Sequence, residues 1–308
     1  MHDLYSSKTY LISYVLRFSL MRDLITEING LSIGLDFPAS DLVFMSHAHT
    51  DHIVRGVKCP VIMSKLTAAL IHHRTGGNYN LMLNYPNLEL LDSGHVIGSK
   101  ALLINSDKKI FYTGDFTTHD RFFLKGLKPV KCDTLIIEAT YGLPGYDLPD
   151  PNEVIREARD VILDDLARGY NPCLVGYALG KAQLITKIAE GLGKVYASED
   201  IRMINNLCNN YGYKILVPDS LNKQDSNFIY ITHNINDAYR IPNSKVYSFT
   251  GWVRQGIEGF PLSDHAGFTD LLKFVKACKP EEVFTHHGFA REFADFLRTE
   301  GFNAVSLD

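Results

Sequence analysis

The chain has 308 residues, of which 45% are hydrophobic and 21% are charged, and its formal net charge is −4. This composition is typical of a globular protein with one large or two modest domains. The slight negative charge excludes a global positive field, although bound divalent cations or a local basic patch could still receive phosphate. The five cysteines show no paired spacing, so we expect reduced thiols and a cytoplasmic protein.

The first 20 residues differ in character from the rest of the chain. Residues 10–20 are apolar, but the run is interrupted by Arg17 and is too short to span a bilayer. No small-residue cleavage site comes after it, so a signal peptide is not expected. Met21 begins a segment that continues into the first domain, and we therefore expect residues 1–20 to be an extension or a mis-assigned start. No membrane-spanning helix is expected elsewhere.

Residues 21–145 are expected to form short strands separated by turns, with one helix. Each predicted strand is an apolar run bounded by turn residues. The predicted helix is Lys65–Arg74, and the predicted strands are Leu31–Leu35, Leu42–Met45, Pro60–Met63, Leu88–Leu91, Ala101–Asn105, Lys109–Thr113 and Thr134–Glu138.

The pattern changes at residue 146, where helices and strands begin to alternate. Such alternation predicts a parallel sheet with crossover helices, so residues 146–255 are interpreted as a small inserted α/β domain. Residues 256–308 return to complete the first domain. The predicted elements are helices Glu153–Arg168, Lys181–Leu192, Asp200–Tyr211, Phe268–Ala277 and Ala290–Thr299, and strands Cys173–Val175, Lys194–Ala197, Phe228–Thr232 and Glu282–Thr285.

The segment Ser46–His52 holds three histidines and an aspartate directly after an apolar strand. Because side chains alternate along an extended chain, His47 and His49 are expected on one face, with Asp51 and His52 just beyond the strand. Imidazole nitrogen and carboxylate oxygen are ligands of zinc, manganese and iron. Four such groups are enough to begin a site for two adjacent metals; the alternative is a polar loop that happens to be rich in histidine.

Three more candidate ligands occur later in the chain, each at the end of a predicted strand. His95 lies in a turn after one strand, Asp115 comes after another through Gly114, and His287 lies beyond a third, next to His286. Glycine at 114 would permit a sharp bend. Each residue alone could be a hydrogen-bonded turn residue, but their order favours a joint role as ligands.

This series of motifs resembles the metallo-β-lactamase fold, an αββα sandwich with a binuclear site at one edge of its two sheets. Later segments resemble the β-CASP nucleases within that fold, which carry an inserted α/β domain. The resemblance runs from about residue 22 to the C-terminus. It is closest to the ligase-associated DNA exonucleases, with a relation to archaeal and eukaryotic RNA 3′-end processing nucleases. The segments that carry it are Leu135–Gly142 with Glu138, Tyr177–Gln183, Gly251-Trp252, Leu262–Ala266 and His287-Gly288.

The resemblance implies two divalent cations, with zinc favoured and manganese also suited to the ligand set. One would be held by His47, His49 and His95, and the second by Asp51, His52 and His287, with Asp115 bridging both. His286 is a weaker candidate ligand than His287, because the family pattern places the ligand directly before the glycine. Asp36 is expected to orient a ligand imidazole from behind; a surface turn is the alternative.

The expected catalytic residues are Asp51, His265 and Glu138. His265 would be the acid that protonates the leaving oxygen, with Glu138 holding it charged; a structural histidine is the alternative. Lys181 at a helix start could contact phosphate or simply be solvated, and Trp252 could stack on a base or pack between domains. The predicted nucleic-acid contacts are Gly180, Lys181, Gln183, Trp252, Arg254 and Ser263.

We therefore expect a two-metal nuclease, most simply an exonuclease of DNA repair or RNA 3′-end processing, with nucleic acid as its partner. One alternative is a glyoxalase-type hydrolase of a small thioester or lactone. Enzymes of that type take a histidine for the second metal not far beyond the bridging aspartate. Here the next histidine after His119 is His233, far downstream, so this alternative is disfavoured. Another alternative is an inactive scaffold subunit of an RNA-processing complex. The sequence leaves open DNA or RNA, exonuclease or endonuclease, zinc or manganese, and whether the chain forms a homodimer.

Overall fold

The computed structural model describes residues 24–28, 30–222, 225–252 and 259–308. The expected extension at residues 1–20, Arg254 and the expected boundary between residues 255 and 256 lie outside the described residues. Among the helices of the described ranges, none combines the length and the apolar character needed to span a bilayer.

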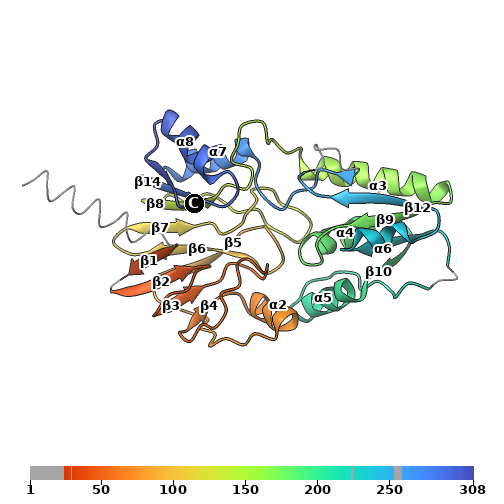
Figure 1. Ribbon diagram of the computed structural model, residues 1–308, viewed down its shortest axis with the longest axis horizontal. Helices are drawn as coiled ribbons and strands as arrows, with labels where there is room; N and C mark the ends of the chain where they lie inside the picture. Colours follow the sequence, from red (N-terminus) through yellow and green to blue (C-terminus); the bar gives the residue numbers. More distant parts are fainter. Residues whose placement is uncertain (1–23, 29, 223–224, 253–258) are drawn as a thin grey trace, which may run out of the picture.

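Two β-sheets face each other in one lobe of the molecule (Figure 1). Their strand orders are β1-β2-β3-β4 and β15-β14-β8-β7-β6-β5. The strands of the first sheet are β1 (Ile25–Ile28), β2 (Leu31–Leu35), β3 (Leu42–Phe44) and β4 (Val61–Ile62). Those of the second are β5 (Leu88–Asp92), β6 (Lys100–Asn105), β7 (Lys109–Tyr112), β8 (Thr134–Glu138), β14 (Glu282–His286) and β15 (Ala304–Ser306).

Alternating side chains on these strands build the layers. Leu102 and Ile104 of β6 pack with Phe44 of β3 between the two sheets, whereas Ala101 and Leu103 belong to the core on the opposite face. This two-residue period is the pattern of a sheet that is buried on both sides.

Helices cover the outer faces of both sheets. α7 (Phe268–Cys278) and α8 (Ala290–Thr299) bury their apolar faces on the six-stranded sheet. α2 (Lys65–Thr75) packs on the outer face of the four-stranded sheet, where Leu66 and Leu70 join its core. The expected αββα sandwich is therefore confirmed.

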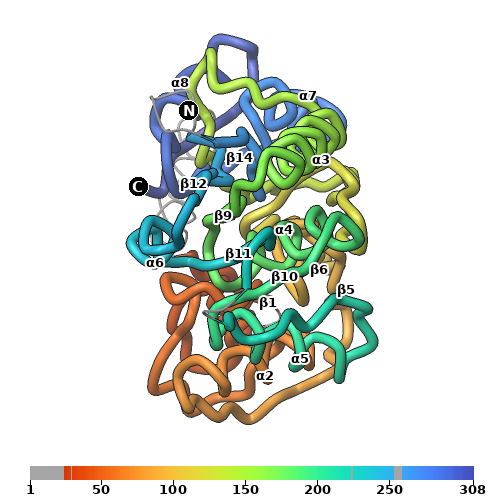
Figure 2. The backbone as a smooth tube through the Cα atoms, turned by 90° about the vertical axis from the view of Figure 1, so that its right-hand side faces the viewer, coloured from red at the N-terminus to blue at the C-terminus, as the bar shows by residue number. Residues whose placement is uncertain are grey.

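The second lobe contains a five-stranded, fully parallel sheet with the order β10-β11-β9-β12-β13. Three helices pack on one face of this sheet, and α6 packs on the other (Figure 2). The predicted parallel sheet is confirmed. Its strands are β9 (Asn171–Val175), β10 (Lys194–Ala197), β11 (Phe228–Thr232), β12 (Ser244–Phe249) and β13 (Gly259–Phe260). Its helices are α3 (Pro151–Ala167), α4 (Lys181–Ala189), α5 (Glu199–Asn210) and α6 (Ile235–Tyr239).

The direction of the strands determines where the polar loops gather. β7, β8 and β14 are mutually parallel, and β5 runs the same way because two antiparallel pairings separate it from β7. The carboxyl ends of these four strands therefore meet at one edge of the six-stranded sheet. The loops at these strand ends carry His95, Asp115 and His287, whereas His47, His49 and His52 come after β3 of the four-stranded sheet.

Leu174, in the central strand β9, is fully buried, whereas Leu163 on α3 is 46% exposed. We expect Leu174→Ala to lower the free energy of unfolding by about 2–5 kcal/mol because it leaves a cavity in a packed core. Leu163→Ala removes the same atoms from the surface and should have little effect. Urea denaturation of both variants checks this, and equal small losses would contradict the burial of β9.

Candidate metal centre

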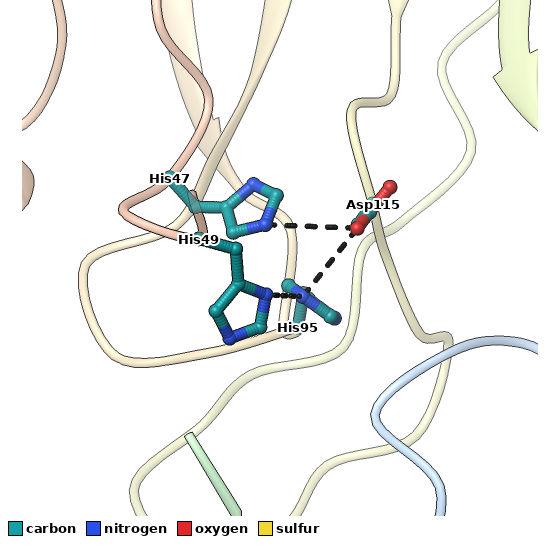
Figure 3. A group of neighbouring side chains, drawn as sticks. All are labelled: His47, His49, His95 and Asp115. Carbon is teal, nitrogen blue, oxygen red and sulfur yellow. Dashed lines mark hydrogen bonds and ion pairs between the residues drawn. The ribbon is translucent and has the colours of Figure 1, made fainter. Parts of the chain in front are cut away.

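Imidazoles and carboxylates from distant parts of the chain converge at the sheet edge. His47, His49, His95 and Asp115 place one ligand atom each within 4.8 Å of one another. Figure 3 shows His47 and His95 both directed at Asp115, and His49 directed at His95. A second group, which meets the same criterion and shares Asp115, adds His52 and His287. Two groups that could each hold a metal ion therefore share one carboxylate, and the binding of two ions stays a prediction.

Asp115 lies at the centre of this arrangement. Its Oδ2 is 3.6 Å from Nε2 of His47, 3.4 Å from Nε2 of His52 and 3.6 Å from Nε2 of His95. One oxygen that faces three imidazole nitrogens from two groups has the position expected of a bridging ligand.

Two glycines allow the loops to approach closely at this edge. Gly114 has φ +52°, and a Cβ there would lie 2.7 Å from Cβ of Ser46. At Gly288, with φ +61°, a Cβ would lie 2.5 Å from Cα of Thr140. His287 itself has φ +60°, a conformation that costs energy in a residue with a side chain and is often found at functional sites.

Asp36 fixes the orientation of two imidazoles. Its Oδ2 lies 2.8 Å from Nδ1 of His52 and 2.9 Å from Oη of Tyr112. Ser46 donates its hydroxyl to the same carboxylate over 2.5 Å, and its oxygen lies 2.8 Å from Nδ1 of His47. Because the serine proton is committed to Asp36, Nδ1 of His47 must donate. Both imidazoles therefore carry a proton on Nδ1 and direct Nε2 towards Asp115.

Backbone carbonyls fix the other two imidazoles. The Leu179 carbonyl lies 3.3 Å from Nε2 of His49, and the Asp264 carbonyl lies 3.0 Å from Nδ1 of His95. A carbonyl oxygen can only accept, so these ring nitrogens carry the protons. The remaining nitrogens, Nδ1 of His49 and Nε2 of His95, then face each other 3.1 Å apart with lone pairs. Two lone pairs so close repel, and a cation that both nitrogens ligate would resolve this.

The donor set therefore fits a metal. Nε2 of His47 is buried and has no hydrogen-bond partner among the described residues. Burial holds the pKa of His47 and His95 well below the usual value and lowers that of His49, which favours the neutral form that metals require. Burial also works against the charge on His52, but Asp115 outweighs it and raises the pKa well above normal. A divalent cation would displace that proton.

Glu138 and His265 lie beside the metal groups. His265 Nδ1 is 2.8 Å from Oε1 of Glu138. Glu138 is fully buried and also accepts hydrogen bonds from the backbone amides of Phe116 (3.0 Å) and Thr140 (3.1 Å). Burial opposes a charge on His265, yet the attraction of Glu138 prevails and raises its pKa to about 9. The imidazole therefore holds a proton at neutral pH, as an acid must.

Asp51 lies apart from the two groups that share Asp115. Its side chain is 71% exposed, and its Oδ2 lies 3.9 Å from Nε2 of His52. It belongs to neither of the two groups that share Asp115. Asp51 lines the cleft beside them, so the structure places it near the second group without bringing it into the cluster.

A cleft of about 780 Å³ lies over these residues and is bordered by both lobes. Trp252 lines it, with its ring centroid 4.8 Å from that of Tyr141, and Ser263 also lines it. Sequence analysis did not identify Arg74 or Tyr177 as site residues, yet both line the cleft, and Tyr177 is 75% exposed. Tyr177 lies in the loop between β9 and α4, where an exposed aromatic ring gives no signal in sequence.

The start of α4 is not arranged as expected. Gln183 is fully buried, and its Oε1 accepts from the Gly180 amide over 2.6 Å. Lys181 is 3% exposed, and its Nζ lies 2.9 Å from Oδ1 of Asp264. Lys181 lines the cleft, but its buried ammonium is already paired with a carboxylate and the Gly180 amide is bonded to Gln183, so a direct contact with phosphate stays a prediction. Burial and pairing cannot be read from the helix-start pattern that suggested these contacts.

Comparisons with known proteins agree with this geometry. A family model described as "Zn-dependent metallo-hydrolase RNA specificity domain" matches residues 253–305. The chain is 29% identical to a probable DNA ligase of Opitutus terrae, over 86% of this chain and 28% of that protein. It is 24% identical to probable RNase MJ4 of Methanocaldococcus jannaschii, over 86% of each protein. It is 27% identical to the 5′ exonuclease Apollo of Gallus gallus, over 84% of this chain and 62% of that protein. The chain thus spans only part of two of these relatives.

Asp36→Asn should weaken metal binding about 10- to 100-fold, because an amide cannot accept from His52, Ser46 and Tyr112 as a carboxylate does. Asparagine keeps the size and tolerates the φ of +51° at this position. Competition with a chromogenic chelator measures the affinity. Asp41→Asn is the matched control, because Asp41 accepts from Ser32 away from the cluster. Unchanged affinity in Asp36→Asn would show that Asp36 has only a local structural role.

Proposed function

We propose that this chain, which belongs to the β-CASP family of metallo-β-lactamase-fold proteins, is a nuclease that uses two divalent metal ions. The observation that carries the proposal is Asp115, whose Oδ2 lies 3.4–3.6 Å from imidazoles of both ligand groups. Zinc is the favoured metal, in keeping with the matched family model, and manganese suits the same ligands.

The proposed ligands of the first metal are His47, His49 and His95. Those of the second are His52 and His287, with Asp51 as the outer candidate and Asp115 shared between both. Two cations held here would supply positive charge to the phosphoryl oxygens and lower the pKa of an attacking water. Asp36, Ser46 and the carbonyls of Leu179 and Asp264 hold four of these imidazoles in fixed directions.

The proposed acid is His265. Its ring lies 4.6 Å from that of His95, centroid to centroid, and its Nδ1 is committed to Glu138, so Nε2 is the atom available to a leaving oxygen. Glu138 accepts from backbone amides on both sides and cannot turn away. The pair can therefore deliver a proton from a fixed position.

The proposed substrate is DNA or RNA, cut from an end. The relatives named as a DNA ligase, an RNase and an exonuclease support this class. Trp252 and the exposed ring of Tyr177 offer faces on which bases could stack, and Arg74 places a guanidinium in the cleft. A cytoplasmic location and a homodimer remain predictions from the sequence.

The experiment that tests the function combines metal analysis with cleavage. Purified protein should bind two equivalents of zinc or manganese and cleave labelled DNA or RNA, single- or double-stranded. Asp115→Ala should reduce cleavage to background because it removes the shared ligand. Its failure to do so with both metals bound would refute the bridging role. Turnover of a thioester without cleavage of any polymer would replace the nuclease with a glyoxalase-type hydrolase.

His265→Ala should keep the metal content and lower the turnover number about 10²- to 10⁴-fold, the usual contribution of a general acid. Metal analysis and single-turnover cleavage measure the two effects separately. His119→Ala is the matched control, since its imidazole pairs with Asp270 at 2.8 Å and does not line the cleft. Loss of metal in His265→Ala would instead make His265 a ligand, because it also lies within ligand distance of Asp115.

A further inference from the structure

The residues directly before His265 are held by two buried cations from distant parts of the chain. The Lys181 ammonium donates a hydrogen bond to the Leu262 carbonyl. Arg121 donates from Nη1 to the Ser263 carbonyl over 2.6 Å. Both cations also meet the same oxygen, Oδ1 of Asp264, at 2.9 Å and 2.7 Å respectively.

Arg121 also reaches the loop that carries a proposed ligand. Its Nη2 donates to the carbonyls of Gly94 and His95, the second over 3.2 Å. The side chain is wholly buried. One guanidinium therefore ties the loop after β5 to the segment before α7, which are about 170 positions apart in the sequence.

His95 is bonded to this cluster through both its backbone and its side chain. Its backbone carbonyl accepts from Arg121, and its side chain donates from Nδ1 to the Asp264 carbonyl over 3.0 Å. The backbone and the ring of this residue are thus held by the same cluster. A shift of Asp264 would rotate the ring and move Nε2 away from Asp115.

Two buried cations on one carboxylate are unusual, because buried charge is costly unless it is paired and hydrogen-bonded. Here backbone carbonyls take the place of water around Nη1 and Nη2 of Arg121 and around the Lys181 ammonium, whereas Nε of Arg121 has no hydrogen-bond partner among the described residues. The cluster holds one positive charge more than Asp264 neutralises. This arrangement would be a poor way to gain stability, which points to a positioning role.

We propose that Arg121, acting with Lys181 and Asp264, is a positioning residue that holds His95 and the segment before His265 in place for metal binding. The inference rests on the proposed two-metal function. It assigns Lys181 to the support of the site instead of to direct contact with phosphate.

Because two cations share the carboxylate of Asp264, either one can be removed while the other stays paired. Arg121→Gln and Lys181→Met each remove one cation and leave the other paired with Asp264, so neither creates an unpaired buried charge. Arg159→Gln is the matched control. Its guanidinium also binds backbone carbonyls, those of Ile188 (2.6 Å) and Glu190 (3.4 Å), and it does not line the cleft.

The measurements are the affinities of the two metal sites and the absorption spectrum of the Co²⁺-loaded protein, which reports ligand geometry independently of activity. We expect Arg121→Gln to weaken one of the two sites at least about tenfold and to change the spectrum, with Arg159→Gln unchanged. Two sites of wild-type affinity and an unchanged spectrum in Arg121→Gln would overturn the proposal. If that variant does not fold, Lys181→Met decides by the same readouts.

Lys181→Met also separates the two roles of the lysine. As a positioning residue, its loss weakens metal binding and leaves the salt dependence of oligonucleotide binding unchanged. A direct phosphate contact would instead give wild-type metal affinity and a salt slope smaller by about one, and this result would overturn the proposal. Failure of the nuclease function would show as a wild-type protein that binds metal but cleaves no polymer, an outcome that the metal affinities distinguish from failure of this inference.

Discussion

The site depends on one constraint, which is that several buried imidazoles must all direct a lone pair at the same small volume. An imidazole in isolation has two tautomers, and only one leaves the correct nitrogen free. The structure resolves this with groups that accept on the far side of each ring, namely the Asp36 carboxylate, the Ser46 hydroxyl that it commits, and the carbonyls of Leu179 and Asp264. On each of these rings, one proton is thereby held on the nitrogen that faces away from the cluster. The convergence of lone pairs, more than the number of histidines, makes the cluster suited to cations.

These acceptors come from both lobes, so the second lobe contributes to the candidate metal centre. Leu179 belongs to the loop between β9 and α4, and it holds His49. Lys181, two positions later, holds Leu262 and Asp264. A loop that only covered a substrate would not need to contact the back of a ligand. The position of the parallel sheet therefore bears on metal binding as well as on the shape of the cleft.

The clustered imidazoles and carboxylates were easier to predict from the sequence than the residues that support them, for a physical reason. Ligands recur as short motifs after apolar runs, and strand direction brings such ends together, so His47, Asp115 and His287 could be proposed from order alone. Alternation along a strand does not explain why His47 and His49 lie together, because β3 already ends at Phe44. Arg121 stands in a loop without periodicity, and two of its partners, Ser263 and Asp264, lie about 140 positions away. The strands β1, β12, β13 and β15 and the short helix α6 were also missed, because such elements are brief or carry polar residues and depend on pairing that sequence does not display.

The path of the chain links the proposed acid to the cleft. The chain leaves the sandwich after β8, which ends at Glu138, and β13, the last strand of the parallel sheet, ends only five residues before His265. Nδ1 of His265 lies 2.8 Å from Oε1 of Glu138. The start and the end of the intervening segment therefore meet in the hydrogen bond that stabilises the charged form of His265. A movement of the second lobe acts on this bond from both sides. A substrate that occupied the cleft between the lobes would therefore lie against the imidazole that is proposed to protonate its leaving group.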